Sequence, residues 1–359
     1  MSANSSVNEF YWGRPCVVLK LWKFVTQLLC CLYTIIKTTQ PARRWKMRQV
    51  IIFLFMFFMA LILHNTAKAQ PNLNQMVNLN VLKQQNSGYR FVTLPLTSQD
   101  GLRHYRIYIA IPDHPAPKEG FPTFYALDGN AVLDFLTPAN MQQLSKRSHP
   151  PVLILLGNAI DKRFDVMARA YDYTIAPAND NIDPLDSTRL NGGADVFLDF
   201  IQNQVMPAVQ QQVQVNQHEQ TLWGHSYGGL FVLHALLAKP DLFQHYIAAD
   251  PSIWLHAELI QAEAVALLQS KTALSSSSLW ILNSKLKINK STKNPQVAAR
   301  IKMRNDQMAK QGDLGNELIS QLQQYTDLKV RYEHYPQENH GSMFGKSLQL
   351  ALFQSMSKK

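Results

Sequence analysis

The stretch Thr221-Leu222-Trp223-Gly224-His225-Ser226-Tyr227-Gly228-Gly229 contains the pattern Gly-x-Ser-x-Gly. This pattern occurs by chance in many chains, so its surroundings decide what it means. A short extended run precedes it at 220–223, and an apolar helical pattern follows it at 230–237 and ends before Pro240. A strand, a glycine-flanked turn and a helix form a nucleophile elbow, which holds its serine in a strained conformation at the edge of a sheet. We therefore predict that Ser226 is a nucleophile; the alternative is an ordinary glycine-rich turn.

Residues 1–69 contain the pattern of an export signal. An unbroken run of 14 apolar residues, 50–63, follows a basic segment at 43–48 and precedes Ala67-Lys68-Ala69. A basic segment, an apolar stretch of this length and a small-x-small site are typical of a secretory signal peptide, whereas a spanning helix needs about 20 apolar residues. We expect a doubtful extension over 1–46 with Met47 as the true start, a signal peptide over 47–69 cleaved near Ala69, and one domain over 70–359.

The export signal changes what the composition means. The chain carries a net charge of +10, but residues 70–359 contain 26 basic and 24 acidic groups. Nothing in that balance indicates a nucleic-acid partner. All three cysteines, Cys16, Cys30 and Cys31, precede the cleavage site. An exported domain without cysteine favours a bacterial periplasm or the exterior, with membrane contact only through the signal segment.

Strand and helix patterns alternate along residues 70–359. The runs 89–95 and 103–111 are rich in β-branched and aromatic residues and indicate two antiparallel starting strands. We expect further strands at 122–127, 152–157, 220–223, 244–249, 279–282 and 328–335, and helices at 130–144, 194–213, 230–237, 257–268, 299–324 and 341–356. Residues 161–193 show little periodicity, which is typical of a functional loop. The order predicts an α/β fold with a mostly parallel central sheet and helices on both faces.

A serine nucleophile needs a base, and in this architecture the histidine comes after the last strand. His340 lies in a loop between the last strand and the last helix, whereas His334 falls inside the strand pattern. We therefore predict that His340 is the base. His225 should point away from the nucleophile and support packing, and His234 should be a buried histidine with satisfied hydrogen bonds.

The third member of the site is less well defined by the sequence. An acid is expected after the strand at 279–282, but lysines follow there. Asp250, directly after the preceding strand, is one substitute, and Glu338 is another. A backbone carbonyl or water can also orient the histidine, at a cost in rate. We favour a Ser–His dyad, with Asp250 as an alternative third member; otherwise Asp250 would cap a helix ahead of Pro251.

Other segments suggest binding roles. The backbone N–H of Tyr227, after the nucleophile, is one candidate oxyanion donor. The second is the N–H of Asn130, with that of Gly129 as an alternative, although Asp128-Gly129-Asn130 could be an ordinary turn. Trp254 could stack on an aromatic substrate or belong to the core. A basic run without acidic residues could attract an anionic substrate or be a solvated face: Lys285, Lys287, Lys290, Lys293, Arg300, Lys302 and Arg304. We find no metal-ligand spacing and no phosphate loop, so we expect no metal and no cofactor.

Several motifs together resemble a known family. They occur in the order Leu127-Asp128-Gly129-Asn130-Ala131, Arg163-Phe164-Asp165, Tyr171-Asp172-Tyr173-Thr174, Gly192-Gly193-Ala194-Asp195, Gly224-His225-Ser226-Tyr227-Gly228 and Asn339-His340-Gly341-Ser342. Over about 76–356 the chain resembles the putative-esterase family of the α/β-hydrolases, and within it the enterobactin, salmochelin and bacillibactin siderophore esterases.

The resemblance implies an α/β-hydrolase fold and hydrolysis of a catecholate trilactone through Ser226 and His340, with oxyanion donors near Asn130 and Tyr227. It implies that Arg163 and Trp254 lie near the substrate, which could carry ferric iron. The periplasmic esterase of this group is described as using a dyad. This chain departs from the family pattern in the lysines after the seventh strand and in Asp250, which stands where a serine is common.

Two alternatives remain at this stage. One is a general carboxylesterase or acyltransferase of the same fold that acts on small acyl esters. The other is a degenerate hydrolase that binds a siderophore without cutting it, although the intact Ser226 and His340 count against this.

Overall fold

The computed structural model describes residues 75–84, 86–177, 179–270, 277–284, 295–324 and 327–355. Its centre is an eight-stranded sheet with the order β1-β2-β4-β3-β5-β6-β7-β8, in which β1 and β2 are antiparallel to their neighbours and the other strands are parallel. The strands are β1 (Tyr89–Thr97), β2 (His104–Pro112), β3 (Phe121–Leu127), β4 (Val152–Asn158), β5 (Val215–His225), β6 (His245–Ala249), β7 (Ser278–Ser284) and β8 (Lys329–Tyr335).

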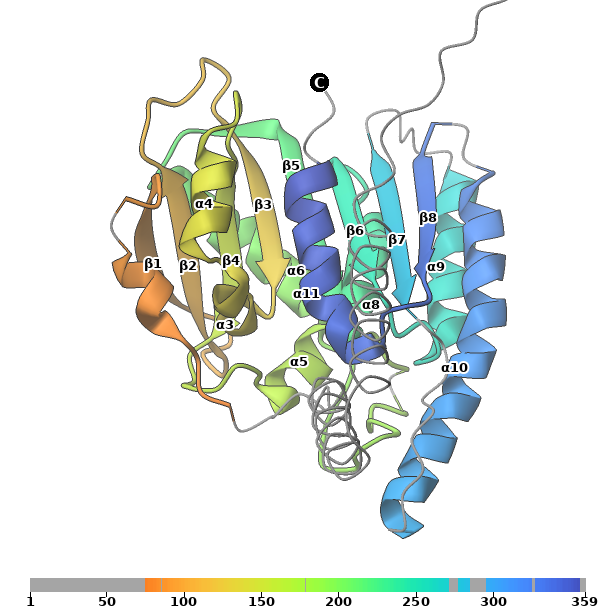
Figure 1. Cartoon of the computed structure of the whole chain (residues 1–359). Helices are drawn as coiled ribbons and strands as arrows, with labels where there is room; N and C mark the ends of the chain where they lie inside the picture. The colour runs from red at the N-terminus through yellow and green to blue at the C-terminus, as the bar shows by residue number, and fades with distance from the viewer. Residues whose placement is uncertain are drawn as a thin grey trace, which may run out of the picture. The chain divides into compact units, whose positions relative to one another are not determined.

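Helices cover both faces of this sheet (Figure 1). The helical elements are η1 (Leu79–Lys83), α3 (Gly129–Val132), η2 (Leu133–Phe135), α4 (Pro138–Ser145), α5 (Val166–Asp172), α6 (Ala194–Phe200), η3 (Ile201–Val205), α7 (Met206–Gln210), α8 (Tyr227–Ala238), α9 (Ala257–Ser270), α10 (Pro295–Leu322), α11 (His340–Leu350) and η4 (Ala351–Ser355). The molecule has two hydrophobic cores. In one, α3, α4 and α11 pack against the sheet. In the other, α5, α6, α8, α9 and α10 do so. The predicted fold class is therefore confirmed.

The hydrophobic patterns explain these positions. All seven residues of β3 are buried, as are the first six of β4, because helices cover both sides of the central strands. β1 alternates toward its end between half-buried and exposed residues, as expected where one face meets solvent. α8 is buried along almost its whole length, which explains why its sequence is apolar on every side. The strand and helix ends agree with the predicted ones to within a few residues, except for β5, which begins at Val215.

Three expectations about helices need correction. The single helix expected over 130–144 is α3, the 3-10 turn η2 and α4, with a break at Leu136 and Thr137. The segment 161–193 contains a short helix, α5, that the sequence analysis missed. The single helix expected over 194–213 is α6 and α7 joined by the π-helical turn η3. Among the described residues, no helix has both the length and the apolar character needed to cross a membrane.

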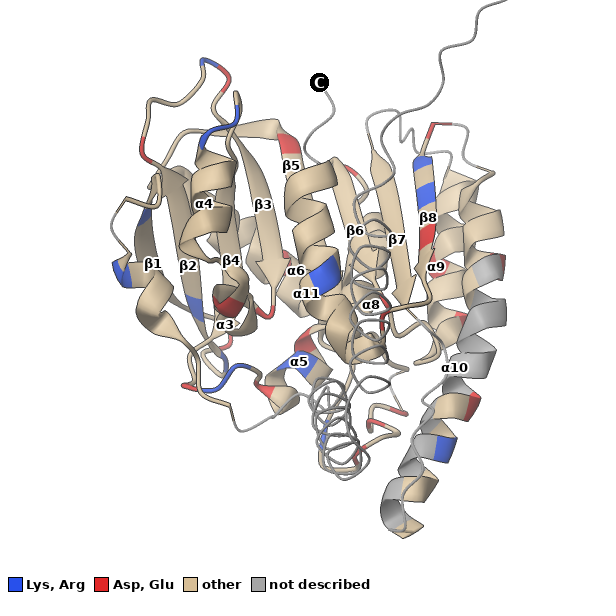
Figure 2. Cartoon of the chain, viewed as in Figure 1, with Lys and Arg blue, Asp and Glu red and all other residues tan. Residues whose placement is uncertain are grey.

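Two other expectations fall outside the described residues. These are the extension and signal peptide over 1–69, and most of the basic run after β7. Of that run, Lys302 is described; it lies exposed on α10 beside Asp306. Elsewhere charges of both signs occur close together, as they do around α5 (Figure 2).

Candidate active site

Ser226 lies at the sharp turn between β5 and α8. Its φ of 63° and ψ of −118° are strained for a residue with a side chain. Two backbone hydrogen bonds hold Ser226 in this conformation. Its N–H donates to the carbonyl of Ala249 (2.9 Å), and its carbonyl accepts from the N–H of Ser252 (3.1 Å). A Cβ on Gly224 would lie 2.3 Å from the carbonyl oxygen of Gly228, so only glycine lets strand and helix approach this closely. The local geometry is that of a nucleophile elbow.

His340 is the first residue of α11, which follows β8. A capping box fixes this helix end: the Asn339 side chain accepts from the N–H groups of Gly341 and Ser342, and the Ser342 hydroxyl accepts from the N–H of Asn339. The imidazole Nε2 of His340 lies 3.0 Å from Ser226 Oγ. Two residues separated by more than a hundred positions are thus within hydrogen-bond distance, the arrangement needed for a base to activate a serine.

Asp250 lies on the other side of the histidine. Its Oδ2 is 3.3 Å from His340 Nδ1, and the two carboxylate oxygens also accept from the N–H and the hydroxyl of Ser284, each at 2.6 Å. Burial alone would raise the pKa of this carboxyl, but its contacts with His340 and Ser284 outweigh burial and hold the pKa below its ordinary value. The sequence analysis favoured a dyad; the structure places a charged acid against the histidine.

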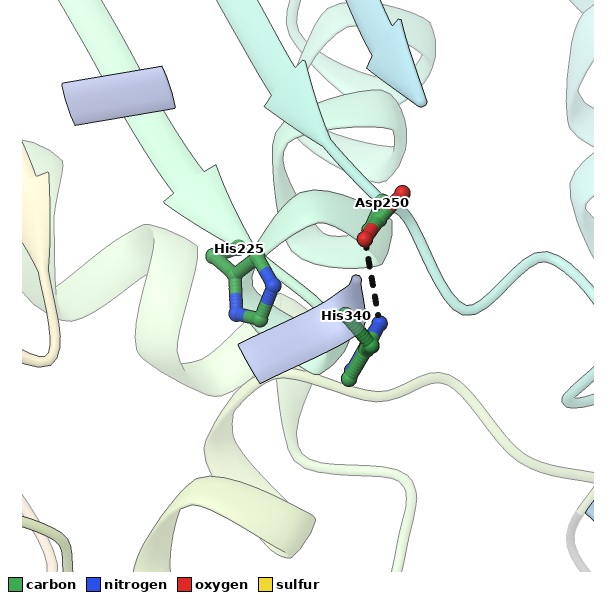
Figure 3. A group of neighbouring side chains, drawn as sticks. All are labelled: His225, Asp250 and His340. Carbon is green, nitrogen blue, oxygen red and sulfur yellow. Dashed lines mark ion pairs between the residues drawn. The ribbon is translucent and has the colours of Figure 1, made fainter. Parts of the chain in front are cut away.

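His225 is also part of this surrounding. Its ring lies against that of His340, with centroids 4.6 Å apart and planes at 42°. The sequence analysis expected His225 to point away from the nucleophile and support packing, and Figure 3 shows it next to Asp250 and His340. Burial, helped by the charge of His340, lowers the pKa of His225 well below its ordinary value, so the ring is neutral.

A half-buried arginine joins the two loops that carry the predicted oxyanion donors. Arg169, on α5, donates through Nε and Nη2 to the two carboxylate oxygens of Asp128, both at 3.0 Å, and its Nη2 is 3.5 Å from the carbonyl of His225. Asp128 precedes α3, and His225 precedes the nucleophile. Arg169 therefore holds the loop after β3 against the elbow, a role that sequence reasoning missed because residues 161–193 have no regular pattern.

Asn130 and Tyr227 both lie in the first turn of a helix that begins at this edge of the sheet. N–H groups of a first turn have no partner within their own helix and can bind an anion. The Asn130 side chain is fully engaged: its amide donates to the carbonyls of Asn158, Ile160 and Lys162, and its oxygen accepts from Tyr108. This buried network fixes the backbone of the loop, which leaves the N–H as the group that can serve an oxyanion.

The two predicted substrate contacts have different surroundings. Trp254 is half-buried, with its ring 6.2 Å from that of Tyr227 beside the elbow. Arg163 has its Nε 2.7 Å from the Asp134 carboxylate and donates through Nη1 to the side chain of Gln75 at 3.0 Å. Its guanidinium is therefore engaged with other side chains, and its substrate-binding role stays a prediction.

Two serines near the site were not found from the sequence. Ser252 Oγ lies 3.4 Å from Ser226 Oγ, and Ser284 holds Asp250 from the end of β7. The signal for Ser284 was its position, since it stands where the sequence analysis looked for an acid. Glu338, the other acid considered, accepts from the Ser342 hydroxyl at the start of α11.

His234 lies further along α8, away from the nucleophile. Its ring nitrogens are 3.2 Å from an Asp195 carboxylate oxygen and 2.9 Å from a Glu263 oxygen. Burial alone would lower the pKa of His234, but the hydrogen bonds to both carboxylates raise it to about 9. The expectation of a buried histidine with hydrogen-bond partners is confirmed.

The arrangement as a whole suits acyl transfer. It combines a strained serine, a histidine within hydrogen-bond distance and a buried carboxylate behind that histidine. Such a set activates a hydroxyl and stabilises the imidazolium that forms when the ring takes its proton.

Comparison with known proteins places this geometry in a family. A family model described as "Putative esterase" matches residues 98–350. The chain is 36% identical over 204 residues to the apo-salmochelin esterase of Escherichia coli O6:H1, covering 56% of this chain and 63% of that protein. It is 36% identical over 165 residues to the ferri-bacillibactin esterase BesA of Bacillus subtilis, covering 44% and 57%. The matches thus span less than two thirds of the length of these relatives.

Solved structures show the same fold over most of the chain. The enterobactin hydrolase IroE in complex with DFP superposes with a TM-score of 0.58 at 28% identity, covering 76% of this chain and 97% of that one. The siderophore hydrolase EstA from Aspergillus nidulans superposes with a TM-score of 0.62 at 29% identity, covering 74% and 93%.

Proposed function

Because this chain belongs to the putative-esterase family of α/β-hydrolases, we propose that it is a serine esterase that cleaves its substrate through an acyl-enzyme on Ser226. The observation that carries this proposal is the 3.0 Å contact between His340 Nε2 and Ser226 Oγ at a strained elbow. A merely structural serine has no need of that backbone strain, which must be stabilised by the rest of the fold.

In the acylation step, Ser226 Oγ attacks the ester carbonyl while its proton passes to His340 Nε2. Asp250 faces Nδ1 of the same ring and stabilises the imidazolium. Negative charge develops on the carbonyl oxygen, and the N–H groups of Tyr227 and Asn130 are the donors we assign to it. The imidazolium then protonates the leaving alcohol, and the acyl group stays on Ser226.

In the deacylation step, a water molecule replaces the alcohol. His340 Nε2 takes a proton from this water as it attacks the acyl carbonyl, and the same oxyanion donors act again. The imidazolium returns its proton to Ser226 Oγ when the acid product leaves. Because one ring serves both steps, its orientation by Asp250 affects each of them.

We assign a catecholate trilactone siderophore, free or with ferric iron, as the substrate class. The relatives named above are a salmochelin esterase, a bacillibactin esterase and siderophore hydrolases. Trp254 beside Tyr227 offers an aromatic surface for catechol rings. The basic run after β7 would attract an anionic substrate from solution, an effect that salt would weaken.

We further propose that the enzyme works outside the cytoplasm, in a bacterial periplasm or beyond, after cleavage near Ala69. The basic segment, the apolar run of 14 residues and Ala67-Lys68-Ala69 support this. The N-terminal sequence of the protein recovered from the periplasmic fraction tests it, and a protein that keeps residues 50–63 would contradict it.

The decisive experiment combines a nucleophile variant with a substrate panel. The purified protein is given apo and ferric trilactones beside short acyl esters, and kcat/KM is compared. We expect Ser226→Ala to abolish turnover while siderophore affinity, measured by fluorescence quenching, is retained.

Ser252→Ala is the matched control, since it removes a hydroxyl 3.4 Å from Ser226 Oγ without removing the nucleophile. Full hydrolysis by Ser226→Ala would refute the mechanism. If the protein cleaves short esters but no trilactone, it is a general esterase. If it binds siderophores without cleaving them, it is a binding protein.

A further inference from the structure

Three side chains of metal-ligating types meet around His340. One ligand atom from each of His225, Asp250 and His340 lies within 4.8 Å of the other two (Figure 3). They come from the end of β5, the turn after β6 and the start of α11. The catalytic steps proposed above use Asp250 and His340 but give no role to His225.

His225 is the observation that points to a ligand. Only 6% of its surface is exposed, and its Nε2 is buried without a hydrogen-bond partner among the described residues. Buried polar atoms are nearly always satisfied in native proteins, so an exception needs an explanation. A neutral imidazole keeps one lone pair, which is what a metal ion requires of a histidine ligand.

We propose that His225, Asp250 and His340 form a Zn²⁺ site that inhibits the esterase. Two imidazoles and one carboxylate, with a fourth position left for water, are a ligand set that zinc accepts. In a tetrahedral site with bonds of about 2.1 Å, neighbouring ligand atoms lie roughly 3.4 Å apart. The 3.3 Å between Asp250 Oδ2 and His340 Nδ1 matches this spacing. The three ligand atoms lie within 4.8 Å of one another, so a shift of at most roughly 1.4 Å by the His225 ring would bring the third ligand atom into range.

Zinc at this position would block catalysis through the tautomer of His340. In the active form Nδ1 carries the proton and faces Asp250, which leaves the Nε2 lone pair to accept the Ser226 proton. A metal ion bound to the Nδ1 lone pair forces the ring proton onto Nε2. The ring then has no lone pair toward Ser226, and the number of protons on the neutral ring is unchanged. The serine stays in place without a base.

The binding test needs no enzyme activity. Zn²⁺ is titrated into the purified full chain in competition with a chromophoric chelator. We expect one zinc per chain and a loss of affinity of about tenfold or more in His225→Asn. His218→Asn is the matched control, because His218 is an exposed histidine on the same strand, β5. Equal zinc affinity of His225→Asn and the wild type would overturn the proposal, as would a stoichiometry of zero.

The inhibition test rests on the proposed esterase function and uses a short acyl ester that binds no metal. We expect Zn²⁺ to inhibit the wild type, EDTA to restore full activity, and Mg²⁺ to have no effect. The zinc concentration for half-inhibition should rise about tenfold or more in His225→Asn, measured against that variant's own activity in EDTA. An unchanged value would refute the site. If His225→Asn does not fold, it is replaced by His225→Phe, which keeps a flat ring against His340. If the enzyme is inactive on every ester, the proposed function is refuted, but the binding test still decides whether the zinc site exists.

Discussion

Replacing Asp250 with asparagine tests whether this site is a triad or a dyad. The side chain keeps its size, and its oxygen can still accept from the Ser284 N–H that now donates to Asp250 Oδ1 at 2.6 Å. The negative charge 3.3 Å from His340 Nδ1 is lost. An amide N–H in its place favours the tautomer with the proton on Nε2, which cannot accept the proton of Ser226.

The magnitude follows from the distance. At 3.3 Å and an effective dielectric constant of about 20, a carboxylate and an imidazolium attract by about 5 kcal/mol. This upper limit corresponds to a rate factor of roughly 10³ to 10⁴. The contact is longer than a typical charge-assisted hydrogen bond, so we expect the actual loss of transition-state stabilisation to be smaller than this upper limit. We expect kcat to fall about 10²- to 10³-fold in Asp250→Asn.

The assay is steady-state hydrolysis of a short acyl ester, with thermal unfolding of each variant to verify the fold. Glu338→Gln is the matched control, because Glu338 is the other acid near the histidine in sequence but contacts Ser342 instead. We expect it to keep kcat within about threefold, as for most substitutions away from the reacting groups. If Asp250→Asn keeps kcat within about fivefold, His340 works without the acid and the site is a dyad.

Three further predictions concern the elbow, its clamp and stability. In Gly224→Ala the new Cβ would lie 2.3 Å from the Gly228 oxygen. Denaturant unfolding should therefore show that the free energy of unfolding falls by about 3 kcal/mol, and esterase activity should also fall. An unchanged unfolding midpoint would contradict the close approach of strand and helix. Arg169→Lys replaces the two-pronged contact with Asp128 by a point charge and should lower kcat about 10- to 100-fold with little change in melting temperature; unchanged kcat would mean that the loop needs no clamp. His234, whose pKa is raised from 6.5 to about 9, contributes stability that is fully present below pH 6.5 and is lost as the pH rises through 9. Over that pH interval the free energy of unfolding, measured by thermal unfolding, should fall by about 1–2 kcal/mol. This is less than the whole pKa shift would give, because one carboxylate partner is exposed. The same decrease in a His234→Gln variant would refute the assignment of this effect to His234.

Most of the fold could be predicted from local sequence patterns. The strand predicted at 152–157 is observed at Val152–Asn158, because a continuous apolar run bounded by Pro151 and Gly157 suits a strand buried on both faces. Helix α5 was missed because seven residues are too few to show a period. Its one local signal was Asp165, whose carboxylate caps the helix by accepting from the N–H groups of Met167 and Ala168.

The site was predictable only where chain order or a local motif specified it. Ser226 has its motif, and His340 was found from its place after the last strand. Arg169 acts through Asp128, 41 positions earlier, and such a contact leaves no pattern in one sequence. Asp250 could be named as a candidate, but its distance to His340 Nδ1 depends on how the turn after β6 is folded.

The position of the acid follows from the geometry of the sheet edge. The sequence analysis expected the acid after β7, where Ser284 stands, and the observed carboxylate comes from β6 instead. Asp250 has a φ of 40°, and its N–H still donates to the carbonyl of Leu282 on β7, so the turn stays attached to the neighbouring strand. This turns the carboxylate toward both Ser284 and His340 Nδ1. A carboxylate oxygen beside Nδ1 orients the ring and stabilises the imidazolium, and either of two adjacent strand ends can supply it. Ser284 then donates two hydrogen bonds to the carboxylate and keeps it charged where it is buried. In the proposed mechanism, Asp250 and Ser284 together take the role that a single acid after β7 would fill.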